Sequence, residues 1–369
     1  MQHRGFAALA VGVLSVTGCE ISTVNDIPNP SGDASTQDAP GSSSGSDGGV
    51  ADSGDANPVE ADAYPEVSNT DAGPLLCDGG ACLVTLATGQ DGPLSIAVDG
   101  KNAYWTNLGG GSVMSVPLGG GTPVAIATGQ QSPAGLAVDG TSVYWTNAVS
   151  AGSVAKAPIA GGQPTILASG QNYPSRLALG ATAVFWTESV PPTWTGGGGS
   201  VVMVGLNGGS TTTLASGLNY PNYITADASF VYWAEDVSGG AIWKAPLGGG
   251  NPVSLSTTAS AAKGIAVDAT SVYWADNNSG TIVKAPLQGG APTTLVSGRQ
   301  KPWGLAVDST SIYWVENVAG GSVMKVGVNG GTPVVLAENQ GGPIGITVDD
   351  TSAYWTNSTG GTVMKLTPK

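Results

Sequence analysis

Histidine and charged residues are scarce in this sequence of 369 residues. Only 10% of the residues are charged, against roughly 25% in an ordinary globular domain. The single histidine is His3, so residues 4–369 contain no imidazole for general acid–base catalysis or for binding a transition metal. This scarcity argues against the enzyme classes that depend on histidine.

Basic residues are too few for a nucleic-acid surface. The formal net charge is −14, from twelve Lys and Arg against 26 Asp and Glu. Residues 20–78 hold twelve of the acids and no base, whereas residues 79–369 hold fourteen acids and eleven bases. The second part is therefore close to neutral, and we expect no nucleic-acid partner because such a partner requires a basic face.

The first nineteen residues are typical of an export signal. "MQHR" carries a positive charge, and "GFAALAVGVLSV" is an apolar run too short to span a bilayer. The following Val16-Thr17-Gly18-Cys19 resembles the lipobox of bacterial lipoproteins, in which the cysteine is lipidated and becomes the first residue after cleavage. The resemblance implies a signal peptide over 1–18 and a lipid on Cys19. An ordinary secretory signal with a chance cysteine is the alternative.

The residue after the cysteine bears on localisation. It is Glu20, whereas Asp at this place resembles the inner-membrane retention signal of enteric bacteria. We therefore expect an exported protein that is anchored by its lipid to a bacterial membrane, with the outer membrane or cell surface favoured.

Residues 19–76 are expected to form a disordered acidic tether. The stretch "SGDASTQDAPGSSSGSDGGVADSGDANP" has almost no large apolar side chain, so it cannot bury enough surface to offset the entropy lost on ordering. A flexible chain of this length reaches on the order of 40 Å. The acids are interpreted as a solvated spacer, with cation binding as the alternative.

An internal repeat predicts the fold of residues 77–369. An aromatic residue followed by Trp recurs seven times, at Trp105, Trp145, Trp186, Trp233, Trp274, Trp314 and Trp355. A period near 40 residues indicates a propeller or a solenoid. Each unit contains four short apolar runs, here named strands a to d, separated by Gly-containing turns. The sequence therefore predicts an all-β, seven-bladed propeller of four-stranded blades.

The first strand of this region is predicted to close the ring. The seventh unit stops at "GTVMKLTPK", after strand c, and "CLVTLATGQ" near the front resembles the strand d sequences of other units, such as "PTILASG". An N-terminal strand that completes the last blade would remove the exposed sheet edges at this seam. Cys77 and Cys82 flank "DGGA" just before it and are expected to form a small disulfide, since export favours oxidation.

The motifs "YWTN" and "YWAD" resemble the YWTD repeat of propellers in low-density-lipoprotein-receptor-like proteins. That family builds six blades, so the resemblance to this seven-unit chain implies only the blade architecture. The aromatic pairs are interpreted as packing between blades. An Asp after strand a is interpreted as a turn former, at Asp99, Asp139, Asp227, Asp268, Asp308 and Asp349.

Departures from the repeat predict a ligand-binding face. Most units have Gly near the start of strand a, but the third and fourth have Arg176 and Tyr223. The third unit also inserts "SVPPTWTGGGG" between strands b and c. The d–a and b–c loops of a meander emerge on one face. The predicted face comprises Tyr173, Arg176, Trp194, Tyr220, Tyr223, Lys263 and Trp303.

Aromatic and polar groups of this kind suit a glycan, peptide or protein ligand. We therefore expect a monomeric, non-catalytic binding or scaffolding module without a cofactor. Packing of these aromatics over the blades, with a purely structural role, is the other interpretation.

Four acids give a competing, enzymatic interpretation. Glu188, Glu235, Asp276 and Glu316 end strand b in the third to sixth units, where the other units have Asn. Oxygen ligands of this kind can hold Ca²⁺. The alternative is a metal-dependent propeller hydrolase or lactonase, in which these acids would converge on the channel axis.

Overall fold

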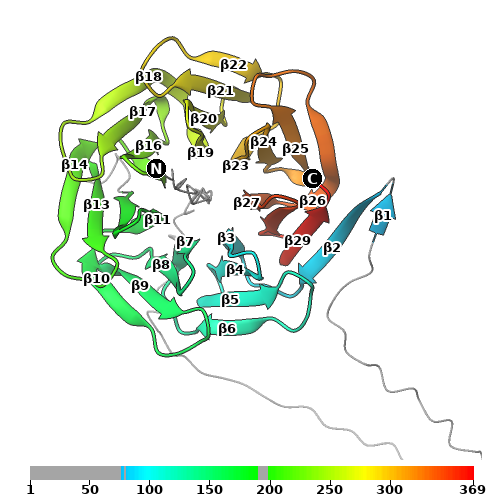
Figure 1. Cartoon of the computed structure of the whole chain (residues 1–369), viewed down its shortest axis with the longest axis horizontal. Helices are drawn as coiled ribbons and strands as arrows, with labels where there is room; N and C mark the ends of the chain where they lie inside the picture. Colours follow the sequence, from blue (N-terminus) through cyan, green and yellow to red (C-terminus); the bar gives the residue numbers. More distant parts are fainter. Residues whose placement is uncertain (1–75, 79, 190–197) are drawn as a thin grey trace, which may run out of the picture. The chain divides into compact units, whose positions relative to one another are not determined.

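The computed structural model describes residues 76–78, 80–189 and 198–369. This part of the chain contains 29 strands and no helix, so it has no helix that could span a membrane. The strands form seven antiparallel sheets, arranged as the blades of a β-propeller around a common centre (Figure 1). The predicted all-β, seven-bladed architecture is confirmed.

In blades 1 to 6, chain order runs from the innermost strand a to the outermost strand d. The a strands are β3 (Pro93–Val98), β7 (Pro133–Val138), β11 (Pro174–Leu179), β15 (Pro221–Ala226), β19 (Ala262–Val267), β23 (Pro302–Val307) and β27 (Pro343–Val348). The b strands are β4 (Asn102–Asn107), β8 (Ser142–Asn147), β12 (Ala183–Glu188), β16 (Phe230–Glu235), β20 (Ser271–Asp276), β24 (Ser311–Glu316) and β28 (Ala353–Asn357). The c strands are β5 (Ser112–Pro117), β9 (Gly152–Pro158), β13 (Gly199–Gly205), β17 (Ser238–Pro246), β21 (Thr281–Pro286), β25 (Ala319–Gly327) and β29 (Thr362–Thr367). The d strands of blades 1 to 6 are β6 (Val124–Ala127), β10 (Thr165–Gln171), β14 (Thr212–Leu218), β18 (Val253–Ser260), β22 (Thr293–Val296) and β26 (Val334–Gly341).

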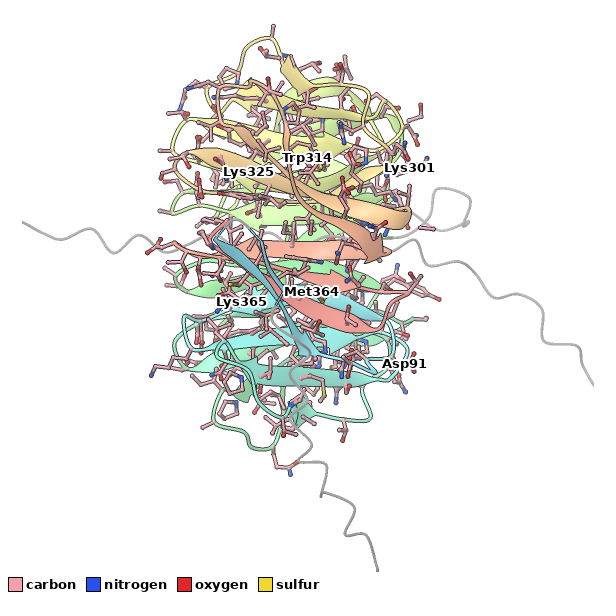
Figure 2. All side chains as sticks on the ribbon, turned by 90° about the vertical axis from the view of Figure 1, so that its right-hand side faces the viewer. Asp91, Lys301, Trp314, Lys325, Met364 and Lys365 are labelled. Carbon is pink, nitrogen blue, oxygen red and sulfur yellow. The ribbon has the colours of Figure 1, made fainter. Side chains whose placement is uncertain are left out.

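Strand d of blade 7 comes from the front of the chain, as predicted. It is β2 (Ala81–Ala87), which pairs antiparallel with β29 so that Val84 lies opposite Lys365 (Figure 2). β1 (Leu76–Asp78) adds a fifth strand outside it. Cys82 is disulfide-bonded, and the predicted partner, Cys77, is opposite it in the register of β1 and β2.

The core is divided among the seven interfaces between blades. Each interface has one hydrophobic cluster, which joins the Tyr or Phe of strand b in one blade to the Trp of strand b in the next. Tyr104 with Trp145 is one example, and Tyr354 with Trp105 joins blade 7 to blade 1. The aromatic pairs therefore pack between blades, as predicted.

A carboxylate binds the buried tyrosine hydroxyl in six blades. In blade 5, Asp268 accepts hydrogen bonds from the Tyr273 hydroxyl (2.6 Å) and from the backbone N–H groups of Thr270 (2.7 Å) and Ser271 (2.8 Å). Blade 3 has Gly180 and Phe185 at the equivalent positions, so the acid and the hydroxyl are absent together. The Asp residues are turn formers, as predicted, and they also satisfy the tyrosines.

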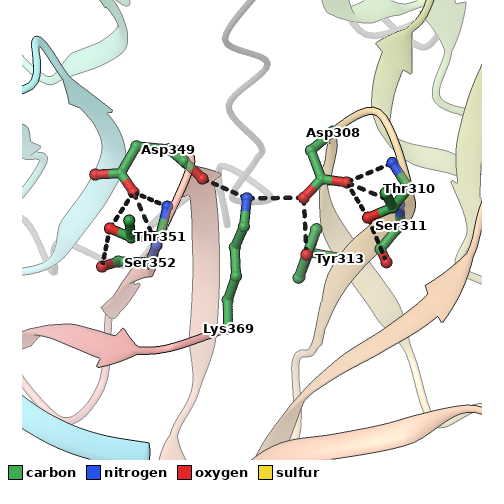
Figure 3. Close-up of polar contacts among 8 residues, drawn as sticks. All are labelled: Asp308, Thr310, Ser311, Tyr313, Asp349, Thr351, Ser352 and Lys369. Carbon is green, nitrogen blue, oxygen red and sulfur yellow. Dashed lines mark hydrogen bonds and ion pairs between the residues drawn. The ribbon is translucent and has the colours of Figure 1, made fainter.

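The C-terminal residue joins blades 6 and 7. The Lys369 ammonium lies 2.7 Å from the Asp308 carboxylate and also donates to the Asp349 carbonyl (Figure 3). In blades 2, 4, 5 and 7 a lysine of strand c makes a link to the next blade, as in the 2.6 Å hydrogen bond from Lys156 Nζ to the Leu206 carbonyl. Each blade is thus attached to the next by packing and by polar contacts.

We predict strong coupling between Asp268 and Tyr273. Asp268→Ala should lower the free energy of unfolding by about 1–3 kcal/mol, because it leaves a buried hydroxyl without its acceptor. The double variant Asp268→Ala, Tyr273→Phe should lose less stability than the sum of the two single losses. It removes the acid and the hydroxyl together, as in blade 3, so no buried hydroxyl is left without an acceptor. Urea unfolding of all variants measures this, and strict additivity would contradict it.

The same carboxylates predict loss of stability in acid. Burial alone raises the pKa of Asp268, but hydrogen bonds from Tyr273, Thr270 and Ser271 outweigh it, and the net pKa is lowered. A carboxyl group whose pKa is lowered on folding stabilises the fold at pH values above its unfolded pKa of about 4. This stabilisation is lost as the pH falls through the folded pKa. Urea unfolding at falling pH should therefore show a decline that is smaller in Asp268→Ala. An equal decline in both proteins would contradict this origin.

Candidate ligand-binding face

The d–a and b–c loops share one side of the ring. Backbone hydrogen bonds join them within a blade, as from Ala148 N to Ser132 O (3.0 Å) and from Asp236 N to Tyr220 O (3.0 Å). Figure 2 shows Asp91 and Lys301, which belong to d–a loops of blades 1 and 6, on the same side. The loops that carry the predicted residues therefore lie on a common face.

Two tyrosines of this face have a left-handed backbone. The residue just before strand a has positive φ in all seven blades, and in blades 1 and 7 it is Gly92 or Gly342. Blades 3 and 4 instead have Tyr173 (φ 50°) and Tyr220 (φ 54°), both half-buried. The left-handed conformation costs a residue with a side chain about 1–2 kcal/mol. Blades 2, 5 and 6 also have a residue with a side chain at this position, Ser132, Ala261 or Lys301, so the large aromatic ring is what distinguishes blades 3 and 4.

Arg176 and Tyr223 meet between the inner strands of blades 3 and 4. In blade 2 the equivalent residue is Gly135, where a Cβ atom would lie only 2.6 Å from the Ser175 carbonyl of the next strand. Arg176 instead extends towards blade 4, with its guanidinium carbon 5.8 Å from the centre of the Tyr223 ring. Both are buried, with 2% and 0% of their surface exposed. Two predicted residues are thus in contact, within the inner wall.

Lys263 and Trp303 form a second contact, between blades 5 and 6. The Lys263 ammonium lies 4.6 Å from the centre of the Trp303 ring and 2.6 Å from Asp236 Oδ2. Asp236 also accepts a hydrogen bond from Asn222 Nδ2 (3.1 Å), and Asn222 Oδ1 accepts one from Ser175 Oγ (2.9 Å). A chain of contacts therefore runs from Ser175 in blade 3 to Trp303 in blade 6 and includes one pair of predicted residues, Lys263 and Trp303.

Three members of this network were not predicted from the sequence: Ser175, Asn222 and Asp236. A signal was available, because blades 1, 2 and 7 have Leu94, Ala134 and Ile344 where blades 3 and 4 have Ser175 and Asn222. Asp236 is the only acid at its position, directly after strand b.

Two predicted residues lie outside the described part of the chain. Trp194 falls within residues 190–197, and Cys19 falls within residues 1–75. Their roles stay predictions.

The four acids at the ends of the b strands hold loops of their own blades. Glu235 accepts hydrogen bonds from the backbone N–H groups of Asn219 (3.0 Å) and Ala241 (3.1 Å). The other acids have equivalent partners: Asn172 N and Ser200 Oγ for Glu188, Ser260 N for Asp276, and Arg299 Nε for Glu316. Burial raises the pKa of Asp276. Each carboxylate thus has a structural role within one blade.

Within residues 80–189 and 198–369, no three His, Cys, Asp or Glu side chains are grouped so that they could hold a metal ion. The Ca²⁺ alternative therefore gains no support from the geometry of these acids.

A hollow of about 470 Å³ lies away from these residues. It is lined by the a–b turns and strand ends at the seam of blades 6 and 7, including Asp308, Lys325 and Lys369. Lys369 is already paired with Asp308, and no predicted site residue borders this hollow.

Neither the known family models nor the curated protein sequences give a match to this chain. Solved structures do give one. The fold is similar to that of virginiamycin B lyase. The enzyme from Staphylococcus aureus is 16% identical, with a TM-score of 0.65 over 78% of this chain and 98% of the lyase. A catalytically inactive His-to-Ala variant of that lyase, with quinupristin, is 17% identical, with a TM-score of 0.63 over 78% and 99% of the two chains.

A nidogen–laminin complex contains a looser match. It is 22% identical, with a TM-score of 0.48 over 59% of this chain and 86% of the other. At these identities the likeness to solved structures shows the propeller fold alone.

We predict that Glu235 acts through its loop. Glu235→Gln should lower the free energy of unfolding by about 1–3 kcal/mol, because charge-assisted hydrogen bonds to two amides are weakened. The control is Glu338→Gln, the same change at an exposed acid. Millimolar Ca²⁺ should leave the melting temperature of the wild type unchanged. A rise with Ca²⁺ that disappears in Glu235→Gln would instead support the metal alternative.

Proposed function

We propose that this propeller is a non-catalytic recognition module whose binding site is formed by the inner strands and d–a loops of blades 3 to 6. The observation that carries the proposal is that departures from the repeat contact one another. Arg176 contacts Tyr223, and Lys263 contacts both Trp303 and Asp236. These contacts do not recur around the ring, so the propeller architecture itself does not require them.

Two observations favour recognition over catalysis. The similar lyase is catalytically inactive when one histidine is replaced by alanine, and this chain has no histidine after His3. The four acids of the metal alternative each accept hydrogen bonds within separate blades. The proposed ligand is a glycan, a peptide or a protein, and the proposed module is a monomer without cofactor or nucleic-acid partner.

We further propose that the protein is exported and anchored to a bacterial membrane through a lipid on Cys19. The support is the apolar run that precedes the lipobox-like Val16-Thr17-Gly18-Cys19, and the acidic Ser/Gly-rich composition of the stretch that follows. Placement at the outer membrane or cell surface would present the propeller on a tether.

The binding proposal is tested with variants that restore residues of the repeat. Trp303→Leu introduces leucine, the residue at the equivalent position of blade 1 (Leu94). Tyr220→Gly introduces glycine, as at the equivalent Gly92 of blade 1. Wild type and the double variant are applied to an array of glycans, peptidoglycan fragments and peptides. We expect a ligand that the wild type binds and the double variant binds at least tenfold more weakly, because its aromatic contacts are gone.

The matched control is Ile344→Leu, at the position of Trp303 but in blade 7. It should bind as the wild type does. Equal binding by the wild type and the double variant would place recognition elsewhere. If none of the three proteins binds, the proposal that the ligand is a glycan or peptide of the kinds on the array is contradicted.

The lipid proposal is tested with Cys19→Ser. In bacteria fed an alkyne analogue of palmitate, the wild type should be labelled and found with membranes. Cys19→Ser should be unlabelled, because the only acceptor thiol at the cleavage site is lost. A wild type that is cleaved and exported without label would instead indicate an ordinary secretory signal.

A further inference from the structure

The guanidinium of Arg176 is buried without a partner for its charge. Its Nε and Nη1 atoms are fully buried and donate no hydrogen bond to any residue that the structure describes, and 2% of the residue is exposed. Its contact with Tyr223 is through the ring face. A buried charge costs several kcal/mol unless another group compensates it. This arginine is therefore an unusual residue to retain for stability alone.

The other buried or half-buried cations nearby are compensated. Lys263 pairs with Asp236 at 2.6 Å, and Arg299 pairs with Glu316 at 2.6 Å. The acids closest in the repeat to Arg176 are engaged, since Glu188 and Glu235 accept backbone hydrogen bonds of their own d–a loops. The residues described here thus supply Arg176 with no carboxylate.

We propose that Arg176 binds the carboxylate of an acidic sugar, as the charged anchor of the recognition site proposed above, on which this inference rests. Nε and Nη1 are enclosed, which leaves Nη2 as the guanidinium nitrogen through which a ligand can bind. A ligand carboxylate that accepts a hydrogen bond from Nη2 would supply the opposite charge that the described residues do not provide.

The surrounding residues favour a sugar acid over an acidic peptide. Half-buried Tyr173 and Tyr220 precede strand a in blades 3 and 4, and each follows an exposed asparagine, Asn172 or Asn219. Aromatic rings pack against the apolar faces of pyranose rings, and amides bind hydroxyl groups. A single uncompensated cation suits one carboxylate of such a sugar.

The test is calorimetric titration of the purified protein with three probes. They are an oligogalacturonate, the neutral oligogalactose of the same length and linkage, and a peptide of glutamates. The wild type should bind the oligogalacturonate most tightly, and Arg176→Gln should bind it at least tenfold more weakly. The control Lys101→Gln removes an exposed cation from the a–b turn of blade 1, away from blades 3 to 6, and should bind as the wild type does.

Salt dependence separates an ionic contact from a structural one. The affinity of the wild type for the oligogalacturonate should fall as salt rises, and this dependence should be weaker in Arg176→Gln. Unchanged binding in Arg176→Gln, or tighter binding of the glutamate peptide through Arg176, would overturn the inference. If the neutral glycan binds and depends on Trp303 and Tyr220 but not on Arg176, the proposed function stands and the sugar-acid inference fails.

Discussion

The contact between the strand b aromatic of one blade and the Trp of the next holds this propeller together. It recurs at every interface, from Tyr104 with Trp145 to the closing pair, Tyr354 with Trp105. Because each blade packs only on its neighbours, the ring needs a complete last blade, and β2 supplies its missing strand. The inner strands and the loops of one face can then vary without disturbing these contacts.

The variation is concentrated in blades 3 to 6. In blades 7, 1 and 2 a glutamine joins the loop to the core: Gln90 Oε1 accepts hydrogen bonds from Trp105 Nε1 (3.0 Å) and Asn107 Nδ2 (2.9 Å). In blades 3, 4 and 6, the indole nitrogens of Trp186, Trp233 and Trp314 are buried without a hydrogen-bond partner in the described residues. These blades thus lack the indole hydrogen bonds that blades 7, 1 and 2 make.

The sequence predicted the blade count, the closing strand and the aspartate turns because each depends on periodicity. It also identified Arg176, Tyr223, Lys263 and Trp303, since each breaks the repeat. It did not predict that they are buried or that Asp236 pairs with Lys263, because burial and pairing depend on contacts between blades that no single repeat encodes. The left-handed Tyr173 and Tyr220 were equally hidden, since a residue before proline is normally extended.

The central claim is that Arg176 is retained for a ligand and not for the fold. The most direct measurement is the free energy of unfolding of Arg176→Met beside Lys263→Met, from urea denaturation. Arg176→Met should be as stable as the wild type or more so, because an uncompensated buried charge is removed. Lys263→Met should lose about 3–5 kcal/mol, because Asp236 loses its buried cation. A loss of that size in Arg176→Met would contradict the account and make this arginine part of the fold.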